Sequence, residues 1–313
     1  MTRAPFEPLP YDEVPEEPRV PHGWSALRQE TLRVASKHFG DTEVHARSLG
    51  QGEPLVLVHG LMTSSYSFRY VFAPLAERFE VIAFDLPGAG RSTAPDVSYG
   101  PRELAAFIGE VLRARNVYGA RVVGNSMGGY LCMQLAIDDP RAMSRLLNLH
   151  SPGLVTPRMI ALEAAFGVLP GAERVVDWLV RRDPYRWVHR NVHYFDETLK
   201  SREEHKEYGD PLTTPAGRRA FARYLADTLR ASEMERFEAR LAALGGEFPV
   251  PLALVYAEKD PMVPPAVGER MRALLPKATF TWLEDASHFA HVDASARFLA
   301  VAMPFLTEGL DAP

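Results

Sequence analysis

The sequence predicts an α/β fold, with an eight-stranded, mostly parallel sheet, helices on both of its faces, and a helical segment inserted after the sixth strand. Short runs of Val, Leu and Ile alternate with amphipathic helical patterns through most of the 313 residues, of which 46% are hydrophobic. Several of the later runs are continuously apolar, as in strands that are buried on both faces. The alternation stops once, over about residues 153–247, where the pattern is helical only.

The apolar runs predict eight strands, at residues 31–39, 42–49, 54–60, 79–85, 120–126, 144–150, 251–258 and 278–284. No helical pattern separates the first two, so we expect an antiparallel hairpin at one edge, followed by strand–helix–strand units. Between later strands, residues 67–79 and 102–112 carry apolar residues at three- and four-residue spacing, which predicts amphipathic helices.

The domain organisation follows from this order. Residues 1–22 are rich in proline and acidic residues and are expected to form an extended arm. Residues 23–152 and 248–313 should form the α/β core, and residues 153–247 a helical cap. An insertion after the carboxyl end of a strand lies over the crevice where open α/β sheets bind ligands. We therefore expect a few of the large cap aromatics to line a pocket, with Trp187 and Tyr194 as candidates, and most of the others to form the core of the cap itself.

Composition narrows the range of partners. Charged residues make up 24% of the chain, the net charge is −5, and no basic cluster indicates a nucleic-acid partner. Cys132 is the one cysteine, so the chain cannot form an internal disulfide, and we expect a cytoplasmic protein. No apolar run is long enough to span a bilayer, so no membrane partner is expected. A small-molecule substrate fits best, and both a monomer and a homodimer stay open.

The stretch "VVGNSMGGY", residues 122–130, carries the main chemical signal. A strand pattern ends at Gly124, a helical pattern begins after Ser126, and Gly128 completes a G-x-S-x-G motif. Such a turn presents one hydroxyl at the carboxyl edge of the sheet, next to helix N-terminal amides that favour negative charge. The alternative is a glycine-rich turn whose serine only caps a helix.

A serine hydroxyl is a poor nucleophile until a base takes its proton and a third group orients that base. Two further strand ends supply these groups. Asp260 follows the strand at 251–258, and His288 follows the strand at 278–284. Glu258 and His291 are the competing acid and base.

Attack on a carbonyl group also requires donors for the oxyanion that forms. The backbone amide of Met127, directly after the serine, is one candidate. The amide of Leu61, in the loop after the strand at 54–60, is the other, because Gly60 before it allows a close approach of the backbone.

The motifs "LVLVHGLMTSSYSFRYV", "FDLPGAGRST", "VVGNSMGGY", "YAEKDPMVP" and "EDASHFAHVD" follow one another along the chain. With these motifs in this order, the chain resembles the α/β-hydrolase-fold superfamily. It is most similar to the capped branch that includes epoxide hydrolases and haloalkane dehalogenases. The resemblance extends from about residue 30 to the C-terminus. The resemblance implies a triad of Ser126, Asp260 and His288. It favours His288 over His291 because an acid, Asp293, follows five residues later.

The same resemblance bears on the reaction. Enzymes of that branch use an aspartate nucleophile, whereas this chain has Ser126, so we expect a serine hydrolase that cleaves an ester or related acyl bond of a small, mostly apolar substrate. The elbow "GNSMGG" is also similar to that of hydrolases that split carbon–carbon bonds, although Phe289 stands where those enzymes usually carry tryptophan. A cofactor-free perhydrolase or haloperoxidase and a slow-turnover ligand-binding receptor are further alternatives.

Other candidate sites are weaker. His189 and His193 have the spacing of a zinc pair, but Arg190 stands in place of the glutamate of that motif and no third ligand is apparent, so no metal is expected. No G-x-G-x-x-G motif follows the first strand, and no cofactor is expected. "DLPGAGRS" resembles a structural turn of the family, so Asp85 and Ser92 receive no chemical role. Cys132 is interpreted as a small core residue.

Overall fold

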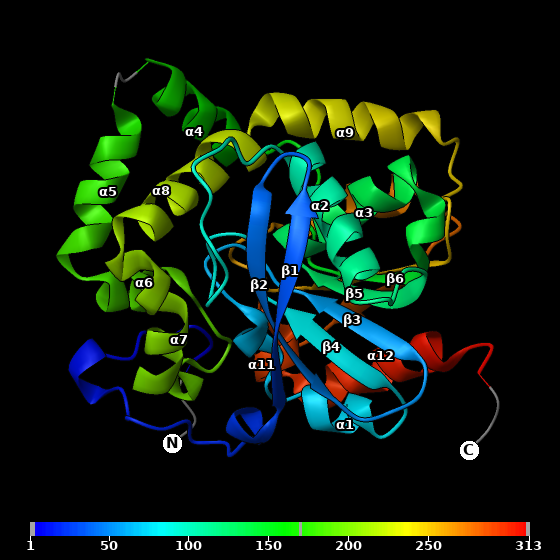
Figure 1. Cartoon of the computed structure of the whole chain (residues 1–313), viewed down its shortest axis with the longest axis horizontal. Coiled ribbons are helices and arrows are strands. Elements are labelled where there is room, and N and C mark those ends of the chain that lie inside the picture. Colours follow the sequence, from blue (N-terminus) through cyan, green and yellow to red (C-terminus); the bar gives the residue numbers. More distant parts are fainter. Residues whose placement is uncertain (1–3, 169–170, 311–313) are drawn as a thin grey trace.

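The computed structural model describes residues 4–168 and 171–310. Its sheet has eight strands in the order β1-β2-β4-β3-β5-β6-β7-β8 (Figure 1). The strands are β1 (Arg28–Ser36), β2 (Gly40–Leu49), β3 (Pro54–Val58), β4 (Glu80–Phe84), β5 (Ala120–Asn125), β6 (Met143–Leu149), β7 (Leu252–Ala257) and β8 (Thr279–Leu283). The first two form the predicted antiparallel hairpin, β2 pairs antiparallel with β4, and the other neighbours are parallel. The predicted fold class is confirmed.

Helices fill the connections between the parallel strands. They are α1 (Phe72–Ala76), α2 (Pro101–Ala114), α3 (Met127–Asp138), α4 (Pro157–Val168), α5 (Ala172–Arg182), α6 (Pro184–Asn191), α7 (Arg202–Thr213), α8 (Pro215–Arg223), α9 (Ala231–Ala243), α10 (Pro265–Leu274), α11 (Ala290–Asp293) and α12 (Ser295–Thr307). The expectation of one helix over residues 67–79 was wrong, because a 3₁₀ turn at Ser65–Phe68 precedes a short α1. Pro74 explains the break, since it cannot donate the backbone hydrogen bond that a longer helix would need at that position.

The sheet divides the hydrophobic core into two layers. In β3, Leu55 and Leu57 belong to the cluster that includes α1 and α12, whereas Val56 and Val58 belong to the cluster that includes α2 and α3. This alternation follows from the two-residue period of a strand. Figure 1 shows α2, α3 and α9 on one side of the sheet and α1, α11 and α12 on the other.

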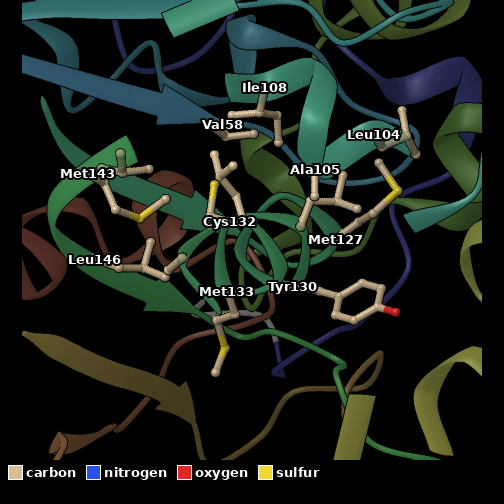
Figure 2. Close-up of a cluster of buried hydrophobic side chains, with 14 of the residues drawn as sticks. Val58, Leu104, Ala105, Ile108, Met127, Tyr130, Cys132, Met133, Met143 and Leu146 are labelled. Atoms are coloured by element: carbon tan, nitrogen blue, oxygen red, sulfur yellow. The ribbon is translucent and has the colours of Figure 1, made fainter. Parts of the chain in front are cut away.

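Helix α3 is buried on nearly all sides. Figure 2 shows its side chains Cys132 and Met133 among residues of α2 and of the sheet, such as Ile108 and Leu146. Burial raises the pKa of the Cys132 thiol, so the group stays neutral and packs as a small apolar residue. The helix that begins directly after Ser126 is therefore held rigidly.

Between β6 and β7, the described residues form helices α4 to α9 with short turns (Figure 1). We call this segment the insertion. Within it, α9 packs along α3, where the ring of Phe237 lies 4.9 Å from that of Tyr130 and Arg240 donates to Gln134 at 2.5 Å. The segment predicted as a cap therefore includes one helix that packs on the core, and its domain boundaries stay a prediction.

A buried ion pair joins the insertion to the core. Arg69, between the 3₁₀ turn and α1, lies 2.6 Å from the Glu204 carboxylate of α7, and both side chains are 0% exposed. The hydroxyl of Tyr194 donates to the same carboxylate oxygen at 2.6 Å. The guanidinium of Arg69 also lies 4.5 Å from the ring centroids of Tyr66 and Tyr70. The cation is thus enclosed by aromatic rings and one anion.

The N-terminal arm packs on the insertion. The ring of Tyr11 stacks on that of His205 with centroids 5.6 Å apart, and the Arg202 guanidinium lies 3.7 Å from the Tyr11 ring. Closer to the N-terminus, Phe6 packs edge-on against Phe195 at 5.7 Å. The arm therefore covers the insertion around α6 and α7.

The Arg69–Glu204 pair leads to a stability prediction. Arg69→Met leaves the Glu204 carboxylate buried without its cation, so we expect a loss of about 3–5 kcal/mol in the free energy of unfolding. The double variant Arg69→Met/Glu204→Met should recover most of the loss, because it removes both buried charges. Urea unfolding followed by circular dichroism measures both. A single variant within about 1 kcal/mol of the parent protein would contradict the prediction.

Candidate active site

Ser126 stands in a strained turn between β5 and α3. Its backbone angles are φ 54° and ψ −123°, a combination that residues with a side chain rarely adopt. The Ser126 N–H donates to the Leu149 carbonyl at 2.7 Å, and the Ser126 carbonyl accepts from Tyr130 at 3.0 Å. Hydrogen bonds on both sides thus hold the turn against its strain.

Glycines make this turn possible because backbone segments meet there. A Cβ atom on Gly124 would lie 2.6 Å from the Cα of Gly129, and one on Gly128 would lie 2.3 Å from the Val58 carbonyl oxygen. Both distances are far below van der Waals contact. The G-x-S-x-G spacing is therefore a packing requirement of this elbow, as well as a turn requirement.

Asp260 and His288 form a buried hydrogen-bonded pair. His288 Nδ1 lies 2.7 Å from Asp260 Oδ2, while the other carboxylate oxygen accepts from the amides of Met262 and Val263 at 2.7 and 2.9 Å. Burial disfavours the charged carboxylate, but the charge and hydrogen bond of His288 outweigh it and hold the pKa of Asp260 below its usual value. An ionised acceptor at Nδ1 favours the tautomer with its proton on that nitrogen, which leaves Nε2 without a proton.

The competing residues lie elsewhere. Glu258 is exposed at the surface, whereas Asp260 is only 6% exposed. His291 is buried against Phe68, at 4.8 Å between ring centroids, and burial holds its pKa well below the usual value. The structure thus brings the predicted acid and base together and leaves both competitors out of the pair.

Asn125 connects this pair to the serine. Its side-chain amide donates to the His288 carbonyl at 3.2 Å and to the Leu149 carbonyl at 3.4 Å. Because Asn125 directly precedes Ser126, the loop that carries His288 is held against the elbow. The sequence analysis gave no role to this asparagine, although its place before the serine was a usable signal.

The two predicted oxyanion donors come from two segments, the loop after β3 and the start of α3. The Gly60 carbonyl is held by the ring of His59 at 2.8 Å and by the Thr63 hydroxyl at 3.1 Å. The planar peptide then directs the Leu61 N–H the opposite way. A Cβ on Gly60 would lie 3.0 Å from the Ser126 Cβ, so this loop touches the elbow. Met127 supplies the first amide of α3.

Leu61 and Met127 also line a cavity of about 30 Å³. Its other walls come from the loops after β3 and β4 and from the insertion, where α7 contributes Tyr208 and Leu212 and α8 contributes Phe221. Trp187 and Tyr194, which the sequence analysis expected in a pocket wall, are not among its lining residues. Trp187 packs on Phe221, with ring centroids 6.3 Å apart, and the Tyr194 hydroxyl is bound to Glu204.

His150 was missed by the sequence analysis. It follows β6, has a positive φ of 55°, and is fully buried with its ring 5.7 Å from that of His288. Burial lowers its pKa to about 3, although the nearby Asp260 carboxylate opposes the shift, so the imidazole is neutral.

The turn after β4 is structural. Asp85 accepts from the Ser65 amide at 2.8 Å, from the Ser65 hydroxyl at 2.7 Å and from the Arg91 amide at 3.0 Å. The hydroxyl of Ser92 donates to the Asp85 carbonyl at 2.7 Å. Both side chains therefore stabilise the turn.

Among the described residues, His189 and His193, the histidines with zinc-like spacing, do not come together with a third ligand. His193 Nδ1 lies 3.3 Å from Glu197 Oε1, whereas the His189 ring packs against Tyr11 at 5.3 Å. Within residues 4–168 and 171–310, no group of three or more His, Cys, Asp and Glu side chains is placed to hold a metal ion.

Comparison with known proteins shows which family the chain resembles. The model of the alpha/beta hydrolase family matches residues 55–301. An uncharacterised hydrolase of Bacillus subtilis (strain 168), YugF, is 28% identical over 242 residues, which cover 75% of this chain and 83% of the relative. A 2-hydroxymuconate semialdehyde hydrolase of Pseudomonas sp. (strain CF600) is 26% identical over 83% of this chain and 88% of its own length.

Among solved structures, the epoxide hydrolase CorEH without ligand superimposes with a TM-score of 0.76, at 22% identity, over 90% of this chain and 99% of that one. This likeness concerns the fold. Since the family model spans most of the chain, from β3 into α12, the protein belongs to the alpha/beta hydrolase family.

Proposed function

We propose that this protein is a serine hydrolase that cleaves an ester, or a related acyl bond, of a small and mostly apolar substrate. The observation that carries the proposal is the buried Asp260–His288 pair, held through Asn125 against the strained turn of Ser126. Hydrolase activity at the level of the family agrees with it. A carboxylate in place of Ser126 would favour attack on a saturated carbon, whereas a hydroxyl with a histidine base favours attack on a carbonyl.

The mechanism follows from the roles of these groups. His288 Nε2 accepts the proton of Ser126 as the serine oxygen forms a bond to the carbonyl carbon. Asp260 stabilises the imidazolium, and the amides of Leu61 and Met127 donate to the oxyanion. The intermediate collapses, the carbon–oxygen bond to the alcohol breaks, and His288 protonates the departing alkoxide. Water, deprotonated by the same histidine, then cleaves the acyl-enzyme and releases the acid.

The walls of the cavity set the substrate class. Side chains of Leu61, Leu212 and Phe221 are apolar, and Tyr208 adds a largely apolar ring. Such a lining favours an acyl or alcohol group with little charge. Three of these four side chains come from the insertion, so we assign it a role in specificity and none in bond cleavage.

Carbon–carbon bond hydrolysis is the second candidate. One relative at 26% identity is named a 2-hydroxymuconate semialdehyde hydrolase, and a serine-based triad can serve both reactions. The difference lies in the leaving group, which must be protonated on carbon instead of oxygen. A screen of p-nitrophenyl esters of graded chain length beside a dienoate ring-cleavage product separates the two. Turnover of the dienoate without turnover of any ester would select carbon–carbon cleavage.

The first prediction concerns the nucleophile. Ser126→Ala should lower kcat for the best ester by about 10⁶-fold, the scale found when a triad serine is removed. A fluorophosphonate probe should label the parent protein at Ser126 only, as read by mass spectrometry of its peptides. Ser64, which caps the 3₁₀ turn, is a matched control, and Ser64→Ala should keep the labelling. Labelling that survives Ser126→Ala would rule out this nucleophile.

The second prediction separates the two candidate acids. Asp260→Asn should lower kcat by roughly 10⁴-fold, because the amide stabilises the wrong tautomer of the histidine. Glu258→Gln should leave kcat within about twofold of the parent, since that exposed side chain lies outside the pair. The measurement is the steady-state rate with one p-nitrophenyl ester. A larger loss in the Glu258 variant would show that the acid is misassigned.

The third prediction concerns the wall formed by the insertion. Phe221→Ala enlarges the cavity, so the preferred acyl chain should become longer by several carbons, as measured by kcat/KM across graded esters. Phe237→Ala is the matched control, because this buried ring of α9 packs on Tyr130 away from the cavity. It should cost about 3–5 kcal/mol of stability with no change of preference. Equal shifts in both variants would refute the assignment of the wall.

A further inference from the structure

The outer face of α5 exposes an unusual group of apolar side chains. Among the described residues, the large apolar side chains with high exposure are Val20, Leu49, Ile160, Val175, Trp178 and Leu179. Three of these six lie within five residues of α5, with Val175 exposed to 55%, Trp178 to 42% and Leu179 to 41%. Their spacing of three and four residues places them on one side of the helix. They form a contiguous stripe rather than scattered single residues.

The opposite face of α5 fastens the helix to the insertion. Val180 is fully buried there, and Asp177 accepts from Arg218 of α8 at 2.6 Å. Figure 1 shows α5 at the outer edge of the molecule, with α8 on its inner side. The stripe therefore faces outward on a helix that is held from behind.

Arginines accompany the apolar stripe. Arg174, Arg181 and Arg182 are all exposed. The helical period places Arg182 beside the stripe, and Arg174 and Arg181 on one flank of α5, between the stripe and the buried face. The Arg182 guanidinium lies 3.7 Å from the Trp178 ring, so the two side chains form one amphipathic unit. Of the two acidic residues of the helix, Asp177 forms an ion pair with Arg218 and does not offset the charge of these arginines. The face is locally basic in a chain whose net charge is −5.

We propose that the outer face of α5 docks on the surface of an anionic lipid bilayer. Val175, Trp178 and Leu179 would enter the boundary between headgroups and acyl chains, while the arginines bind lipid phosphates. Neighbouring α8 carries Phe221, so docking places the wall of the cavity close to the lipid.

This proposal changes one expectation from the sequence. The absence of a membrane partner was expected because no apolar run could cross a bilayer, and within the part of the chain that the structure describes no helix has the length and apolarity to do so. An interfacial helix needs neither property. It needs an exposed apolar stripe flanked by cations, which α5 has.

Co-sedimentation of the full chain with vesicles tests the proposal. Vesicles of phosphatidylglycerol and phosphatidylcholine should bind the protein, whereas vesicles of phosphatidylcholine alone should bind it at least about tenfold less, and added salt should weaken binding. Trp178→Ser/Leu179→Ser and Arg181→Glu/Arg182→Glu should each reduce binding at least about tenfold. Leu49→Ser and Arg33→Glu, exposed positions on the β1–β2 hairpin, are matched controls that should bind like the parent.

Two further readouts make each outcome decisive. Light scattering measures the oligomeric state, and an α5 variant that dissociates a dimer without changing vesicle binding would overturn the proposal. Lack of vesicle binding by the parent, or equal binding by parent and both α5 variants, would overturn it as well. Turnover of a soluble p-nitrophenyl ester and circular dichroism should be unchanged in all four variants. Since binding is measured without catalysis, a failure of ester turnover would count against the proposed function alone.

Discussion

The strained turn at Ser126 is the constraint on which the rest of the site depends. A residue with a side chain persists at φ 54° only where its surroundings determine the conformation more strongly than the strain opposes it. Here the surroundings are the end of β3, a helix buried on nearly all sides, and glycines that let backbones touch. The side chain of Asn125 then carries this rigidity to the loop of His288. The elbow thus fixes both the serine and the neighbourhood of its base.

Neutral imidazoles lie near the Asp260–His288 pair. Burial lowers the pKa of His150 to about 3 and holds that of His291 well below its usual value. The ring of His59 is likewise buried, which lowers its pKa, and it serves as a brace between Gly60 and Leu86. A positive charge that develops on His288 during catalysis would therefore be balanced by Asp260, because these three rings carry no charge of their own.

Much of this could be predicted from the sequence, because strands and elbow are encoded by short-range patterns. All eight strands, the hairpin edge and the positions of Ser126, Asp260 and His288 at strand ends follow from local sequence. The structure differs from the sequence-based expectations where packing between distant segments determines the position of a side chain. His150 and Asn125 acquire their places only when β6 pairs with β5 and the loop after β8 reaches the elbow. Which aromatics wall the cavity depends on how the helices of the insertion turn, and α9 lies along α3 because its apolar face meets Tyr130.

The two ends of the chain are fastened to different parts of the molecule. The arm pairs with the insertion through backbone bonds, in which Arg202 and Glu203 donate to the carbonyls of Pro15 and Glu16. At the other end, Arg121 of β5 donates to the carbonyl of Leu306 in α12, on the far face of the sheet. A fusion partner or affinity tag before the arm is therefore attached to a segment that is bonded to α7, a helix that lines the cavity. A tag after α12 is attached to a segment that is bonded to the sheet instead of to the insertion.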